Sequence, residues 1–243
     1  NEVLLRKELE PLELYAYLDF MKSHTKKPVT TAETWDIWEK NPQLASHVDF
    51  LTIHILPYWE KVPIERYNEF IIEKYSVVEE LFPNRKIVIG ETGWPSHGYN
   101  NNSAIPSIKN QAQAIRGFVN LAHEKGWHYN IIEALDQPWK GYDEGNVGQY
   151  WGIFTTDRAL KFQLAGEVEL NKYWLYQMIA AIIIGALLTL FGLKNQRVNI
   201  SHAFAYAIAA QGMAFGIVMA AIYPFVNYMN FGMWIMWGMG SFL

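Results

Sequence analysis

Two long charge-free runs constrain the fold of this chain more than any other feature. The first run covers residues 173–193 and the second covers residues 203–226. Each is long enough to cross a hydrocarbon layer of roughly 30 Å as a helix, which takes about 20 apolar residues. A third run covers residues 231–243. The sequence therefore predicts membrane-spanning helices over all three runs, the last of them incomplete.

The charged residues divide the chain at the same place. All 24 acidic residues precede Lys172, and only Lys194 and Arg197 carry a formal charge after it. A basic connection between two spans predicts a cytoplasmic loop, which places the residues before Lys172 on the other side of the membrane. The acidic first part gives no electrostatic reason to expect nucleic acid as a partner. With no cysteine in the chain, disulfides and thiolate chemistry are excluded.

The first 168 residues alternate strand and helix patterns. Apolar and β-branched runs that predict strands occupy 27–33, 48–54, 87–89 and 128–134. Apolar residues at helical spacing predict helices over 64–82 and 107–125. Strands separated by helix-length connections predict a parallel sheet with right-handed crossovers. We therefore predict an α/β domain over 1–168, a linker over 169–172 and membrane helices over 173–243.

A further helix is predicted shortly after the start of the chain. The sequence Glu-Leu-Glu-Pro precedes it, and the Pro suits the first turn of a helix. Its apolar residues, spaced three apart, are Leu12, Tyr15, Leu18 and Met21. This spacing predicts an amphipathic helix with these four side chains on its buried face.

One carboxylate falls where α/β enzymes carry out their chemistry. Residues 86–98 read Lys-Ile-Val-Ile-Gly-Glu-Thr-Gly-Trp-Pro-Ser-His-Gly. The β-branched triplet is typical of a strand buried on both faces, and the glycines and the proline end it. Glu91 thus stands at the carboxyl end of a parallel strand, followed closely by Trp94, and active sites of such sheets lie at that end. A glutamate that only caps a turn is the plainer alternative.

The string over 86–98 closely resembles the signature of family-17 glycoside hydrolases, the β-1,3-glucanase family. The resemblance implies that Glu91 is the nucleophile of a retaining mechanism. Members of this family end their fourth barrel strand with Gly-Asn-Glu, in which the Glu is the general acid/base and the Asn contacts the 2-hydroxyl of the reacting sugar. Asn1 and Glu2 match the last two positions of that string. The implied fold is the C-terminal half of a (β/α)8 TIM barrel followed by transmembrane α-helices.

The resemblance and the strand ends also imply substrate contacts. These candidates are Asn1, Glu33, His54, Tyr58, Trp94, Trp139, Lys140 and Glu144. For Glu33 a surface loop acid is an equally good interpretation, and Trp139 fits a core position as well as a sugar-binding one.

The chain departs from the family pattern at two positions. Leu56 stands where relatives have Tyr or His near the nucleophile, so that His54 or Tyr58 would have to orient it. Gln137 stands where plant relatives have Glu. These departures favour, as an alternative, a non-catalytic glucan-binding or guiding module of a membrane polysaccharide synthase.

The proposed chemistry needs two carboxyl groups in different environments. One must be protonated to give its proton to the leaving oxygen, and the other must be ionised to attack the anomeric carbon. No metal site is expected, because the histidines show no paired ligand spacing, and no phosphate-binding glycine loop suggests a cofactor. Water or a sugar hydroxyl would resolve the glucosyl-enzyme, so hydrolysis and transglycosylation both stay open.

A family-17 domain followed by membrane spans resembles bacterial bifunctional proteins that continue into a family-2 glycosyltransferase. The resemblance implies a multi-pass protein of the bacterial inner membrane, with the barrel on the periplasmic side. Its expected partners are β-1,3-glucan or its oligosaccharides, the lipid bilayer, and a glycosyltransferase domain outside this sequence. A transporter with an extracytoplasmic domain is the weaker alternative, because the spans contain no acidic or basic residue to form a charged relay.

Overall fold

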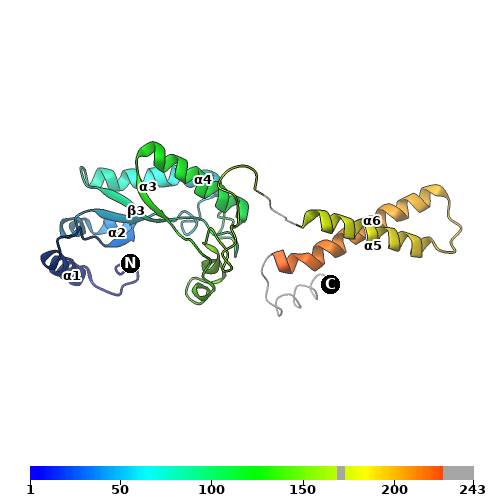
Figure 1. Ribbon diagram of the computed structural model, residues 1–243, viewed down its shortest axis with the longest axis horizontal. Coiled ribbons are helices and arrows are strands. Elements are labelled where there is room, and N and C mark those ends of the chain that lie inside the picture. The colour runs from blue at the N-terminus through cyan, green and yellow to red at the C-terminus, as the bar shows by residue number, and fades with distance from the viewer. Residues whose placement is uncertain (169–172, 227–243) are drawn as a thin grey trace. The chain divides into compact units, whose positions relative to one another are not determined.

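The computed structural model describes residues 1–168 and 173–226. The chain divides into two compact units, Asn1–Val168 and Glu169–Leu243, both drawn in Figure 1. The predicted linker 169–172 and the third predicted span 231–243 lie outside the described residues.

The first unit is built on a four-stranded parallel sheet. Its strands are β1 (Ala32–Thr34), β2 (Leu51–His54), β3 (Ile87–Thr92) and β4 (His128–Ile131). They lie side by side in chain order, and every neighbouring pair is parallel. The predicted α/β fold with a parallel sheet is confirmed. Strands β1, β2 and β4 are shorter than the runs that predicted them, whereas β3 extends beyond its run to Thr92.

Helices connect the strands and cover the sheet, with α3 and α4 lying side by side in Figure 1. The α-helices of this unit are α1 (Pro11–His24), α2 (Trp35–Lys40), α3 (Tyr67–Leu81) and α4 (Ile108–Lys125). Short 3-10 helices are η1 (Pro42–His47), η2 (Ile64–Arg66), η3 (Pro138–Tyr142) and η4 (Asn146–Tyr150). Helix α4 begins where Ser107 caps it and ends where Gly126 adopts a φ of 67°.

The predicted buried face of α1 is partly wrong. The residues that this helix buries are Leu14, Tyr15 and Leu18. Leu12 is 76% exposed and Met21 is 50% exposed. An α-helix has 3.6 residues per turn, so the side chains of one face recur at intervals of three and four residues. The buried face is centred on Leu14 and Leu18, and a strict spacing of three residues departs from it.

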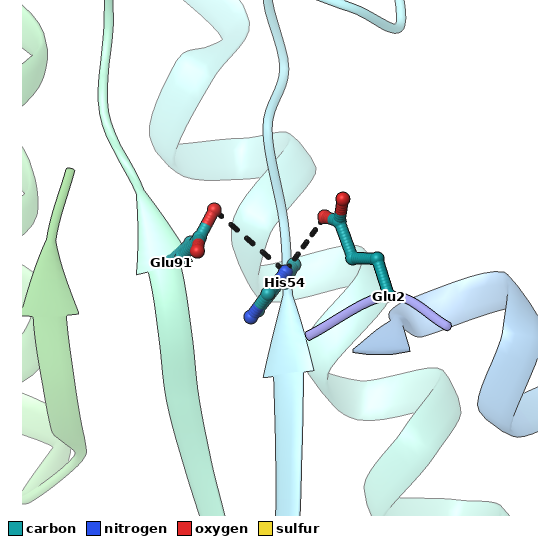
Figure 2. A group of neighbouring side chains, drawn as sticks. All are labelled: Glu2, His54 and Glu91. Carbon is teal, nitrogen blue, oxygen red and sulfur yellow. Dashed lines mark hydrogen bonds and ion pairs between the residues drawn. The ribbon is translucent and has the colours of Figure 1, made fainter. Parts of the chain in front are cut away.

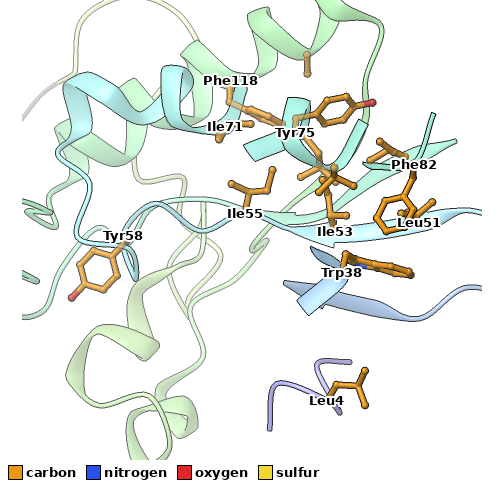
Figure 3. Close-up of a cluster of buried hydrophobic side chains, with 14 of the residues drawn as sticks. Leu4, Trp38, Leu51, Ile53, Ile55, Tyr58, Ile71, Tyr75, Phe82 and Phe118 are labelled. Carbon is orange, nitrogen blue, oxygen red and sulfur yellow. The ribbon is translucent and has the colours of Figure 1, made fainter. Parts of the chain in front are cut away.

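The core lies between the sheet and helices α2 to α4. Leu51, Ile53 and Ile55 are fully buried along β2 and just beyond its end, as Figure 3 shows. The Trp38 indole of α2 is fully buried against this strand and donates its N–H to the carbonyl of Thr52 at 2.9 Å. Burying an indole costs little when its N–H is hydrogen-bonded in this way. The strand ends are thereby fixed relative to one another.

The second unit contains two packed helices, α5 (Trp174–Leu193) and α6 (Ile200–Val226). They meet through small residues, because an added Cβ at Gly185 of α5 would lie 2.2 Å from the Gln211 side chain of α6. Gln211 donates to the carbonyl of Ala181 at 3.0 Å across this contact. By length and composition, both helices are able to cross a membrane, and only 11% and 17% of their most apolar stretches are buried.

Candidate active site

An irregularity in strand β3 aims Glu91 at the end of the sheet. In the pairing of β2 with β3, Ile53 lies opposite Ile89, but His54 lies opposite Glu91, so that Gly90 is an extra residue. Such bulges bend a strand locally and redirect a side chain. A Cβ added at Gly90 would lie 2.9 Å from two atoms of the His54 ring. The glycine therefore makes room for the imidazole beside Glu91.

Glu2, His54 and Glu91 come together at this end of the sheet (Figure 2). Nδ1 of His54 lies 2.8 Å from Oε1 of Glu2 and 3.7 Å from Oε2 of Glu91. One oxygen of Glu2 and one of Glu91 lie within 4.8 Å of each other. Retaining glycosidases hold their two carboxyl groups about 5 Å apart, whereas inverting enzymes need about 6.5–9.5 Å. The separation fits a retaining double displacement.

The segment that bears Glu2 is tied to strand β1. The backbone N–H of Glu2 donates to the carbonyl of Ala32 at 2.7 Å, and Glu2 adopts a positive φ of 56°. Glu33 accepts hydrogen bonds from the backbone N–H groups of Leu4 at 2.9 Å and Leu5 at 3.3 Å. These bonds hold a backbone conformation that is strained for any residue but glycine.

The predicted sugar contact of Glu33 is corrected by this arrangement. Its side chain is fully buried and lies outside the residues that line the pocket. Both carboxylate oxygens accept backbone hydrogen bonds from the segment after Glu2. Glu33 therefore holds that segment in place beneath the site.

The two central carboxylates differ in their surroundings. The hydrogen bond from His54 is the main cause that lowers the pKa of Glu2, against the opposing effect of burial, and Arg6 adds to it with a contact of 3.2 Å to Oε2. The carboxamide of Asn1 donates to Oε1 of Glu91 at 3.3 Å. Asn1 thus contacts Glu91, and its predicted contact with a sugar 2-hydroxyl stays a prediction.

A pocket of about 440 Å³ opens over these side chains. Four of the predicted site residues line it: Glu2, His54, Glu91 and Glu144. Burial is the first cause that raises the pKa of Glu144. The pocket also includes Leu56, which occupies the position where the family pattern has Tyr or His.

The pocket wall includes aromatic and cationic residues that the sequence did not single out as site residues. These are Arg6, Trp35, Trp59 and Trp151. Trp59 is 38% exposed and stacks on Trp151, with ring centroids 6.0 Å apart and an angle of 29°. The indole N–H of Trp151 is buried without a hydrogen-bond partner among the described residues. The Pro-Tyr-Trp sequence after β2 was the available signal for Trp59.

Tyr58 and Trp94 do not line the pocket, and their predicted substrate contacts are corrected. Both side chains are fully buried. The Tyr58 hydroxyl donates to the carbonyl of Tyr99 at 2.8 Å, and the Trp94 indole donates to the carbonyl of Ile105 at 3.1 Å. Their rings pack edge to face at 5.9 Å. They support the loops around the site, and Tyr58 does not orient Glu91.

Trp139 and Lys140 also lie outside the residues that line the pocket. Trp139 is 60% exposed. Lys140 is mostly buried and pairs with Oε2 of Glu133 at 2.8 Å, and Gln137 donates to the same oxygen. Burial is the first cause that raises the pKa of Glu133. Lys140 thus forms an ion pair with Glu133, a residue that the sequence did not single out, and its predicted sugar contact stays a prediction.

Lys161 links the last part of the unit to the segment after β4 by a buried ion pair and to the loop after β3 by a hydrogen bond. Nζ of Lys161 lies 2.6 Å from Oδ1 of Asp136, with side chains that are 4% and 9% exposed. Lys161 also donates to Oγ of Ser96 at 2.7 Å. The pKa of the neighbouring His97 is lowered to about 4, first by burial and then by the Lys161 ammonium.

Glu2, His54 and Glu91 also offer three ligand atoms within 4.8 Å of one another, a spacing that one divalent cation can bridge. The histidine atom in that set is Nδ1, which is hydrogen-bonded to Glu2. A ring nitrogen that donates a hydrogen bond cannot bind a metal at the same time. The hydrogen bond between His54 and Glu2 accounts for the close approach of these two residues without a metal ion. The absence of a metal and of a cofactor stays a prediction.

Comparison with known proteins identifies the family. Residues 1–152 match the family model described as the BtgE/BtgC glycoside hydrolase domain. The chain belongs to this family. Its relatives include the glucan 1,3-beta-glucosidase of Saccharomyces cerevisiae, which is 30% identical over 155 residues, or 59% of this chain and 49% of that protein. The chain thus spans about half the length of this curated relative.

Solved structures confirm the predicted resemblance to family-17 glycoside hydrolases. A family-17 β-1,3-glucanosyltransferase from Rhizomucor miehei superposes with a TM-score of 0.61 at 27% identity, over 66% of this chain and 59% of that one. An active-site mutant of the Rhizomucor miehei enzyme in complex with laminaritriose has a TM-score of 0.60 at 24% identity, over 70% of this chain and 62% of that one. The first unit is therefore part of a glycoside hydrolase domain.

In this glycoside hydrolase domain, we predict that His97 lowers the stability of the fold in acid. The unfolded chain binds a proton at His97 near pH 6.5, whereas the folded chain does so only near pH 4. Stability contributed by the neutral imidazole is therefore lost as the pH falls between these values. His97→Gln removes this loss. Between pH 7 and pH 4.5, the free energy of unfolding should therefore fall by about 2 kcal/mol less in the variant than in the wild type.

Urea unfolding of the full chain at the two pH values, followed by tryptophan fluorescence, measures this difference. His24→Gln, which replaces an exposed histidine on α1, is the control. Its free energy of unfolding should fall between the two pH values by as much as that of the wild type. An equal pH dependence in the His97→Gln variant and the wild type would show that the prediction is wrong.

Proposed function

We propose that this protein cleaves or transfers β-1,3-glucan by a retaining double displacement, with Glu91 as nucleophile and Glu2 as acid/base. The observation that carries the proposal is the approach of their carboxylates to within 4.8 Å at the open end of a parallel sheet. Two glutamates at this spacing provide both functions that a retaining glycosidase needs.

The relatives support β-1,3-glucan as the substrate class. Their names describe a glucan 1,3-beta-glucosidase and a β-1,3-glucanosyltransferase, and the latter has been crystallised with laminaritriose. The pocket offers the partly exposed indole of Trp59, which stacks on the buried Trp151, for the flat face of a sugar ring, with carboxylates for its hydroxyls. We extend the substrate class of these relatives to this protein.

We also propose that the four strands are half of an eight-stranded barrel. The matched Rhizomucor miehei chain is covered over only 59% of its length. Parallel strands that pair in chain order, joined by helices, are the repeating unit of a (β/α)8 barrel. In a closed barrel the pocket would be completed by loops of the other strands.

The reaction then proceeds in two balanced steps. In the first, the Glu91 carboxylate bonds to the anomeric carbon while the glycosidic C–O bond breaks, and Glu2 gives its proton to the departing oxygen. In the second, Glu2 takes a proton from water or a sugar hydroxyl, whose oxygen attacks the anomeric carbon and frees Glu91. Water yields hydrolysis, and a sugar hydroxyl yields a transferred glucan.

The first prediction from this proposal concerns Glu91→Gln. Without a carboxylate at this position no glucosyl-enzyme can form, so turnover of laminari-oligosaccharides should fall by more than about 10³-fold. Mass spectrometry and linkage analysis of the products give the measurement. Glu80→Gln, which makes the same change at an exposed position of α3, is the control and should keep full turnover.

The products also separate the alternatives. Shorter sugars alone indicate a hydrolase, and longer or branched sugars indicate a transglycosylase. If the wild-type protein binds the oligosaccharides and leaves them unchanged, the enzyme proposal is wrong, and a glucan-binding or guiding module takes its place.

A second prediction concerns the aromatic wall of the pocket. Trp59→Ala removes an exposed indole that lines the pocket, and should weaken binding of laminari-oligosaccharides by roughly tenfold. Trp139→Ala removes an indole of greater exposure outside the pocket lining and should change binding little. Titration of the Glu91→Gln background with laminaritriose measures both. Equal losses in the two variants would contradict the pocket assignment.

We further propose that α5 and α6 anchor the domain in a bacterial inner membrane, with residues 1–168 on the periplasmic side. Support comes from their apolar length and from Lys194 and Arg197 in the connection between them, which favour a cytoplasmic loop. The resemblance to bacterial bifunctional proteins adds the proposal that a family-2 glycosyltransferase accompanies this domain, so that glucan synthesis and remodelling are coupled across the membrane.

The topology predicts where single cysteines react, since the natural chain has none. Ser23→Cys, at an exposed position of α1, should react with a membrane-impermeant maleimide in intact spheroplasts. Asn195→Cys, between α5 and α6, should react only after lysis. Equal labelling of both before lysis would contradict the proposed topology.

A further inference from the structure

His54 is a buried residue that one ring nitrogen connects to both candidate glutamates. It ends strand β2, and its side chain is 1% exposed. Nδ1 lies 2.8 Å from Glu2, which is a hydrogen bond, and 3.7 Å from Glu91, which is too long for one. Figure 2 shows the ring between the two carboxylates. The imidazole is therefore hydrogen-bonded to Glu2 and only near Glu91.

The direction of the hydrogen bond follows from the chemistry of its partners. An ionised carboxylate has no hydrogen to donate, so Nδ1 must carry the hydrogen whenever Glu2 is ionised. The bond therefore requires a hydrogen on Nδ1 of His54. A donor aimed at a carboxylate favours the ionised form of that carboxylate over the protonated form.

The structure also keeps the ring in this place. Gly90 leaves a space that the ring edge fills, since a Cβ there would lie 2.9 Å from Cδ2 and Nε2 of His54. The bulge at Gly90 sets His54 opposite Glu91 in the pairing of β2 with β3. Backbone and side chain therefore cooperate to present Nδ1 to Glu2.

Building on the roles proposed above for Glu2 and Glu91, we propose that His54 is a positioning residue for the acid/base. Its Nδ1 hydrogen holds the Glu2 carboxylate in the pocket and favours the ionised form, which is the form that must act as base in the second step. The same bond opposes the protonated form that the first step needs. His54 thus influences the pH below which Glu2 is protonated for the first step and above which it is ionised for the second.

Other charged groups also surround Glu2. Arg6, on the same segment, contacts the other oxygen and also favours the ionised form. On the neighbouring strands, Glu33 of β1 and Glu91 of β3 carry the same charge as Glu2, and the charge of Glu2 is one cause that raises the pKa of Glu33, after burial. Glu144 lines the same pocket. The pKa of Glu2 is lowered despite its burial, and the hydrogen bond from His54 is the largest cause.

Two substitutions at His54 separate the donor from the bulk of the ring. His54→Leu removes the hydrogen-bond donor, whereas His54→Asn keeps an N–H donor on the atom that follows Cγ, as in Nδ1. In the Leu variant the alkaline limb of kcat/KM on laminari-oligosaccharides should move up by about one to two pH units, because Glu2 holds its proton longer. The Asn variant should restore most of the wild-type profile.

Two controls make the shift specific. His47→Leu removes another histidine that contacts a carboxylate, because His47 Nδ1 lies 2.9 Å from Oδ1 of Asp19 outside the pocket. The alkaline limb of kcat/KM in this variant should stay at the wild-type pH. On an aryl β-glucoside whose phenol needs no proton to leave, the alkaline limb should be insensitive to His54. A fall in rate with an unchanged limb in His54→Leu indicates a merely structural residue and overturns the proposal.

A titration that needs no turnover completes the test. The carboxyl of Glu2 is followed by ¹³C NMR in the full-length protein with labelled glutamate, and its resonance is identified by its loss in Glu2→Gln. The midpoint should be higher in His54→Leu than in the wild type and close to the wild type in His54→Asn. Equal midpoints overturn the proposal. A wild type that turns over neither substrate refutes the proposed function, while the titration still decides the effect of His54.

Discussion

The pairing of β2 with β3, interrupted by one extra residue at Gly90, is the constraint on which the site depends. Regular pairing up to Ile53 and Ile89 fixes the two strands in the core. The extra residue then brings His54 opposite Glu91 rather than opposite Gly90. Since adjacent residues of a strand point to opposite faces, a shift of one residue decides whether a side chain faces the pocket. Gly90 accepts this arrangement because it has no side chain to collide with the imidazole.

Much of the fold could be predicted from the sequence because its signals are local. Apolar β-branched runs located the strands, and Ser107 and Gly126 located both ends of α4, where a hydroxyl caps the first turn and a left-handed residue ends the last. The face of α1 was predicted less well. Leu12 lies two residues before the buried Leu14, about 200° around the helix and so on its opposite face, and only tertiary packing decides which face is buried.

The site was predictable in its position along the strands but not in the direction of each side chain. Glu91 and His54 follow from strand ends, because the carboxyl ends of parallel strands meet at one edge. Beyond the strand ends, the sequence does not predict which side chains face the pocket. Tyr58 and Trp59 are neighbours after β2, yet one is buried and the other lines the pocket. Their loop turns through contacts with distant segments, such as the bond from Tyr58 to Tyr99, and no local pattern encodes them.

The groups around Glu2 do not by themselves give the protonation pattern that the proposed reaction needs. Two donors favour an ionised Glu2, although the first step requires its proton. A bound glucan changes this balance. Its glycosidic oxygen is an acceptor and favours a protonated Glu2, whereas the positive charge that develops at the anomeric carbon favours an ionised Glu91. Displacing water from the pocket strengthens both effects. In the proposed reaction the substrate therefore assigns the roles. Once Glu2 has given its proton to the leaving group, the hydrogen bond from His54 stabilises the carboxylate that remains.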